Sequence, residues 1–120
     1  MKEQKVRKFN LGSENKVIMG KWVAKNGEFE ISIDGNVGVF SQINSGEWFP
    51  LLKRGKLSIG SQKLKDITKS GELTWRCMEL LRDSFSFYWG TTTSLTLNRT
   101  GDILTVSNYI QTYTLSRVHE

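Results

Sequence analysis

Cysteine, histidine and proline are nearly missing from this chain of 120 residues, which has one of each: Cys77, His119 and Pro50. A single cysteine cannot close an intramolecular disulfide, so the chain is not a small secreted domain held together by disulfides. One cysteine and one histidine also exclude the ligand spacing of a zinc finger. We therefore expect no bound metal and no cofactor.

Long apolar runs are missing as well. The first eight residues are rich in lysine and arginine, but no apolar stretch of about 7–15 residues follows, as a secretory signal requires. Nor is there a run of about 20 apolar residues that could form a membrane helix. The sequence as written predicts a cytoplasmic protein, whereas removal of an earlier signal would give a secreted or periplasmic one. We expect a flexible basic segment over residues 1–16 and one domain over residues 17–118.

Side chains for catalysis are sparse. His119 stands next to the end of the chain, and Cys77 continues an apolar alternation with Trp75 and has no second histidine to activate it. No pair of carboxylates lies in an apolar setting that would raise one of their pKa values. We therefore expect a protein that is not an enzyme.

The strongest positive signal is an alternation of apolar and polar residues with period two. Phe29, Ile31 and Ile33 alternate with polar residues, and the turn-forming residues 34–36 follow them. A second alternation over residues 37–43 places Val39 on the apolar face. Such a pattern on both sides of a Gly-containing turn predicts a β-hairpin.

The same punctuation continues along the chain. Turn residues recur at about 8–12-residue spacing, which is typical of all-β sandwiches and barrels. The short runs rich in β-forming residues are 20–24, 57–59, 64–67, 73–78, 84–89, 94–98, 103–107 and 112–118. Sequential strands joined by tight turns pair as a meander, and closure removes the exposed edges of the sheet. The sequence thus predicts one antiparallel up-and-down β-barrel of about eight strands.

Two motifs carry a family resemblance. Gly20-Lys21-Trp22 opens the first strand, and the last strand carries Leu115-Ser116-Arg117. This pattern resembles the calycins, and in particular small bacterial lipocalin-like domains. The resemblance implies that Trp22 packs at the closed end of the barrel beneath Arg117. An arginine over an indole ring contributes about 0.5–2 kcal/mol and would join the first strand to the last.

The interior of an eight-stranded barrel is just wide enough to be filled by side chains or to hold one small ligand. We expect a small apolar or amphipathic molecule as the partner, in line with the resemblance. The candidates for the lining are large residues on the apolar faces of the expected strands: Phe29, Ile31, Val39, Trp75, Phe87, Trp89 and Leu97.

The charge suggests an alternative. Seventeen Lys and Arg against twelve Asp and Glu give a net charge of +5. A basic barrel with aromatic residues could bind nucleic acid by gripping phosphates and stacking bases. The candidate residues, in the 53–69 region, are Lys53, Arg54, Lys56, Lys63 and Lys65.

A further alternative is that the barrel binds a protein partner. The loop of residues 45–49 would then bind the partner as the loop of a protease inhibitor binds a protease. This mode of binding needs an exposed apolar loop tip.

Overall fold

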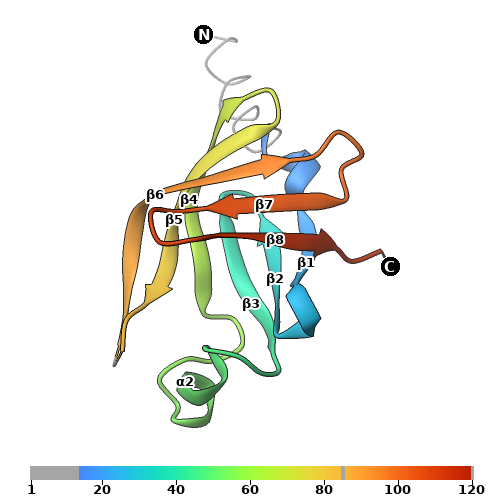
Figure 1. Ribbon diagram of the computed structural model, residues 1–120. Helices are drawn as coiled ribbons and strands as arrows, with labels where there is room; N and C mark the ends of the chain where they lie inside the picture. The colour runs from blue at the N-terminus through green and yellow to red at the C-terminus, as the bar shows by residue number, and fades with distance from the viewer. Residues whose placement is uncertain (1–13, 85, 120) are drawn as a thin grey trace, which may run out of the picture.

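Eight antiparallel strands, each paired with its neighbours in the chain, close into a barrel in the computed structural model of the protein (Figure 1). The structure describes residues 14–84 and 86–119. The strands are β1 (Gly20–Ala24), β2 (Phe29–Asp34), β3 (Val37–Ile43), β4 (Gln62–Gly71), β5 (Thr74–Arg82), β6 (Phe87–Leu97), β7 (Ile103–Ser107) and β8 (Thr112–Arg117). The predicted up-and-down barrel is confirmed.

The short helical elements lie outside the sheet. They are the 3-10 turns η1 (Lys16–Ile18) and η2 (Lys25–Gly27) and the helix α2 (Phe49–Lys53). No helix among the described residues is long and apolar enough to cross a membrane. The flexible segment expected over residues 1–16 lies outside the described residues as far as residue 13. Asn15 is buried and donates hydrogen bonds to the carbonyls of Gly35 and Ile67.

The hairpin of β2 and β3 forms as predicted, but the expectation for Val39 is wrong. Val39 is only half-buried, whereas Phe40 is fully buried. Ile31 pairs with Phe40 and Glu30 pairs with Gln42, so Ser41 is one extra residue in β3. This β-bulge lets both Phe40 and Ile43 face inward, which strict alternation does not allow.

The strand predicted at residues 57–59 is also wrong. The chain instead forms α2 and then a loop up to residue 61, before β4 begins. Pro50 stands in the first turn of α2, where its lack of an N–H costs nothing. Leu51 and Leu57 are buried, so the apolar residues of this region pack on the barrel without joining the sheet.

A second β-bulge, in β4, determines the direction of the Lys63 side chain. Gly38 pairs with Leu64 and Val39 with Gln62, so Lys63 is one extra residue in β4. Both Lys63 and Leu64 are buried as a result. A bulge commonly redirects a side chain in this way, and here it sends a lysine toward the interior of the barrel.

The middle of the barrel is filled with apolar side chains. Trp22, Trp75, Phe40 and Leu64 are fully buried there. The end of the barrel at η1, where β1 begins and β8 finishes, is closed: the Nε1–H of Trp22 donates to the carbonyl of Ile18 at 2.8 Å. A pocket lined by aromatic and charged side chains opens at the opposite end.

Candidate functional site

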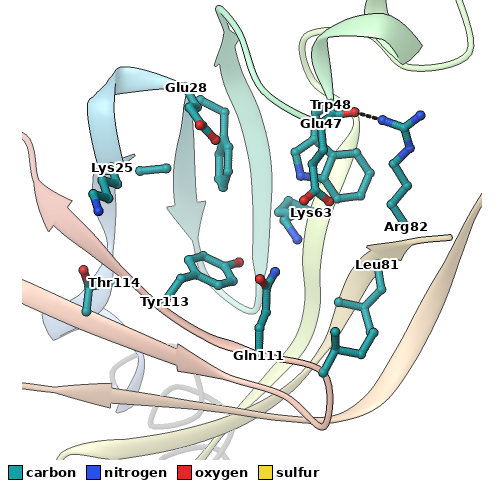
Figure 2. A pocket seen from close by; sticks show the side chains of 13 residues that line it. Lys25, Glu28, Glu47, Trp48, Lys63, Leu81, Arg82, Gln111, Tyr113 and Thr114 are labelled. Atoms are coloured by element: carbon teal, nitrogen blue, oxygen red, sulfur yellow. Dashed lines mark hydrogen bonds between the residues drawn. The ribbon is translucent and has the colours of Figure 1, made fainter. Parts of the chain in front are cut away.

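A pocket of about 260 Å³ opens at the end of the barrel away from Arg117. It lies where β1 and β5 finish and where β2, β4 and β8 begin. Figure 2 shows the side chains around it. The lining residues are Ala24, Lys25, Glu28, Phe29, Glu47, Trp48, Lys63, Leu81, Arg82, Ile110, Gln111, Tyr113 and Thr114.

Aromatic rings form much of the wall. The centroid of the Phe29 ring lies 6.4 Å from that of Tyr113, with the rings edge to face. Phe40 lies behind them, 5.7 Å from Phe29 and 5.5 Å from Trp48. Edge-to-face contacts of this kind hold rings in place, so the wall is formed before any ligand arrives.

Trp48 reaches the wall from outside the sheet. It comes directly before α2 and is 3% exposed, while residues 45–47 before it are exposed. Within residues 45–49, Trp48 thus turns into the barrel, and the other large apolar side chain, Phe49, is half-buried and packs against the core. The exposed apolar loop tip that the protein-partner alternative requires is not there.

The floor of the pocket is polar. The ammonium of Lys63 lies 2.9 Å from Oε2 of Glu79 and donates to the carbonyl of Leu80 at 2.7 Å. These side chains are almost fully buried, Lys63 at 2% exposed and Glu79 at 0%. A buried ion pair of this kind persists only when further hydrogen bonds satisfy its remaining atoms.

Three neutral side chains supply those bonds to Glu79. Tyr113 donates its hydroxyl to Oε2 at 2.5 Å. Oε1 accepts from the Thr93 hydroxyl at 3.1 Å and from the Asn108 amide at 2.8 Å. The carboxylate therefore has four donors from four strands or loops. It fixes the Tyr113 hydroxyl and the Lys63 ammonium at the floor of the pocket.

The surroundings shift the pKa values of these groups. Burial lowers the pKa of Lys63, although the Glu79 carboxylate opposes this. Burial alone would raise the pKa of Glu79, but the charge of Lys63 and its hydrogen bonds hold that pKa below its usual value. Burial and the nearby Glu79 carboxylate raise the pKa of Tyr113 well above normal. Glu79 is thus ionised and Tyr113 is a neutral donor at pH 7.

The mouth of the pocket carries charges of both signs. Lys25 and Glu47 are exposed there, and Glu28 and Arg82 are half-exposed. Arg82 donates a hydrogen bond to the carbonyl of Glu47, drawn as a dashed line in Figure 2. This bond ties the end of β5 to the loop that carries Trp48.

Of the seven predicted lining residues, Phe29 lines the pocket. Ile31, Trp75 and Leu97 are buried in the filled part of the barrel. Val39 faces outward because of the bulge at Ser41 in β3.

The prediction is wrong for Phe87 and Trp89 too. Phe87 is 37% exposed. Trp89 is half-buried, with the ammonium of Lys65 4.2 Å from its ring centroid. Cys77 pairs with Thr93 but Glu79 pairs with Gly90, so β6 has one extra residue between these pairs. This bulge reverses which residues of β6 face inward.

The predicted basic patch is divided by the fold. Lys63 lies inside the barrel, so it cannot contact phosphates on the surface. Lys65 covers Trp89 on β6. Lys53, Arg54 and Lys56 are exposed at the end of α2 and in the loop after it. The five residues therefore form no continuous surface.

Sequence reasoning did not place Trp48, Lys63, Glu79 or Tyr113 in the pocket, and it assigned Lys63 to the basic patch. Glu79 carries a usable signal, because it continues the alternation of Trp75 and Cys77 on the inward face of β5. Lys63 carries none, since its direction depends on a bulge that the pairing with β3 creates. Among the described residues, no three His, Cys, Asp or Glu side chains are grouped as they would be to hold a metal.

The structure brings Trp22 and Arg117 together at the closed end. They are paired across β1 and β8, and the guanidinium of Arg117 lies over the indole ring. Comparison of the chain with protein-family models, curated proteins and solved structures found no match.

Proposed function

We propose that this protein is a non-enzymatic binding barrel that takes up one small, mostly apolar ligand in the pocket at its open end. The observation that carries the proposal is the pairing of an aromatic wall with a buried polar floor in a single opening. Small-molecule sites are typically concave and apolar, with a few well-placed polar groups that orient the ligand.

The size of the pocket limits the ligand. An apolar cavity of about 150 Å³ holds one benzene molecule, so a pocket of about 260 Å³ has room for a compact molecule of about ten non-hydrogen atoms. Fully buried residues fill the barrel beyond the floor. A long acyl chain would therefore have to displace the core, and a short, compact ligand fits better.

Binding can be tested with acetophenone as the probe. Addition to the protein should shift the indole N–H resonance of Trp48 in ¹H–¹⁵N spectra, assigned by its loss in Trp48→Phe. The chain has four tryptophans. Trp22 and Trp75 do not line the pocket, so their indole resonances should shift less than that of Trp48.

A pocket-filling variant provides the matched comparison. Ala24 is buried and lines the pocket, so Ala24→Leu should reduce the affinity for acetophenone roughly tenfold by occupying part of the space. Val39→Leu adds bulk at a half-buried outward position and should leave the affinity unchanged. Equal binding by the two variants would refute the proposed function, as would the absence of a Trp48 shift with acetophenone and also with the similarly shaped ethylbenzene and benzoate.

A further inference from the structure

Lys63 presents an unused hydrogen-bond donor at the floor of the pocket. A lysine ammonium has three N–H groups. Among the described residues, two of them find acceptors: Oε2 of Glu79 at 2.9 Å and the carbonyl of Leu80 at 2.7 Å. The side chain lines the pocket (Figure 2), so the third N–H is available to an acceptor that enters it.

Aromatic rings flank this donor. The Nζ atom lies 4.8 Å from the ring centroid of Trp48 and 5.9 Å from that of Tyr113. A flat ligand lying between these rings would bring an oxygen at its edge to the ammonium. The hydrogen bond would therefore fix both the depth and the orientation of the ligand.

The charge of Lys63 is already balanced. Glu79 is fully buried beside it and stays ionised through its own hydrogen bonds. A ligand carboxylate at the same ammonium would place two anions against one cation away from water, which is unfavourable. A neutral oxygen accepts the hydrogen bond without adding charge.

The cations at the mouth do not change this balance. Lys25 and Arg82 are accompanied there by Glu28 and Glu47. Lys25 is exposed to solvent, where an ion pair with a ligand contributes little. An anionic ligand would thus gain little binding energy from the charges at the mouth, and it would be repelled by Glu79 at the floor.

We infer that the ligand is a neutral, compact aromatic molecule with one oxygen acceptor, such as an aryl ketone or aldehyde, and that Lys63 donates the hydrogen bond that orients it. This inference rests on the proposed function and specifies the class of ligand. It assigns Lys63 as a specificity-determining residue rather than a purely structural one.

Three probes of similar shape test the inference on the unaltered protein: acetophenone, ethylbenzene and benzoate. Dissociation constants come from the shift of the Trp48 indole resonance. Acetophenone should bind more tightly than ethylbenzene by roughly tenfold or more, as expected for one hydrogen bond from a charged donor, and benzoate should be the weakest. With ¹³C at its carbonyl, bound acetophenone should also show the downfield shift of a hydrogen-bonded ketone.

Lys63→Met then tests the donor itself. The variant should lose the carbonyl shift and bind acetophenone and ethylbenzene equally. Because it also leaves Glu79 unpaired, Lys63→Met/Glu79→Gln serves as the second variant with the same expected result. Equal or tighter binding of benzoate, equal binding of ethylbenzene to the unaltered protein, or a carbonyl shift retained without Lys63 would overturn the inference alone. Failure of all three probes to bind would instead overturn the proposed function and the inference with it.

Discussion

The guanidinium carbon of Arg117 lies 4.3 Å from the centroid of the Trp22 ring. From this position Arg117 donates hydrogen bonds to the carbonyls of Gly101 and Met19, at 2.8 and 3.1 Å, and also to that of Val17. One side chain on the last strand thus holds the segment before β1 and the turn between β6 and β7. The contact joins the two ends of the meander where the barrel closes.

Replacement of Trp22 should therefore be costly. Trp22 is 0% exposed, so Trp22→Ala should lower the free energy of unfolding by about 3–5 kcal/mol, as for other buried aromatic residues. Urea denaturation measures the change. A loss below about 1 kcal/mol, as is typical of exposed sites, would show that this contact does not seal the barrel.

Arg117→Met should also destabilise the protein, by about 1–3 kcal/mol, because it removes the donors to three carbonyls. Arg99→Met is the matched control, since Arg99 is exposed in the turn after β6. Its effect should stay within about 0.5 kcal/mol. Equal effects of the two substitutions in urea denaturation would remove the special role of Arg117.

The ion pair of Lys63 and Glu79 should show strong coupling. Loss of one member leaves an uncompensated buried charge, so Lys63→Met and Glu79→Gln should each cost about 3–5 kcal/mol. The double variant should cost clearly less than the sum, because neither charge remains. A double-mutant cycle from denaturation curves measures this difference, and strict additivity would mean that the two charges do not interact.

Acid should destabilise the protein through Glu79. Its pKa is lowered in the folded state, whereas the pKa of a glutamate in an unfolded chain is about 4.3. The unfolded chain therefore binds more protons, so the stabilisation by Glu79 is complete above about pH 5 and is lost as the pH falls through the folded pKa. Free energies of unfolding between pH 2 and 6 should fall less steeply in Glu79→Gln than in the exposed control Glu72→Gln. Parallel profiles would contradict this assignment.

Cys77 should resist modification in the folded protein. It is buried, and burial together with the Glu79 carboxylate raises the pKa of its thiol to about 12. The reactive thiolate is therefore scarce at pH 8, and a reagent can reach the sulfur only when the barrel opens. Labelling with a thiol reagent should be slow in buffer and fast in urea, and slow compared with Ser45→Cys in a Cys77→Ala background. Rapid labelling in buffer would show that β5 opens readily.

Much of the fold followed from local signals. The alternation of Phe29, Ile31 and Ile33 and the turn at Gly35, where φ is 63°, specified the hairpin of β2 and β3. Tight turns between short strands then favoured a closed meander, because closure protects the edges of the sheet. The meeting of Trp22 with Arg117 was expected from the family resemblance rather than from periodicity.

The pocket was much harder to foresee. Each bulge shifts the alternation by one residue and exchanges the two faces of the strand beyond it. Ser41 did this in β3, so Phe40 and not Val39 faces inward. In β6 the same effect left Phe87 outside the barrel.

The sequence by itself determined most of the strands, their turns and their order, because these depend on neighbours a few residues apart. It did not show that residues 57–59 stay outside the sheet. Only the tertiary structure decided that Lys63 points inward to Glu79 and that Trp48 folds back to form a wall. Those outcomes depend on pairing between strands and on how much of the interior the other side chains fill. The site exists because packing left one end of the barrel open.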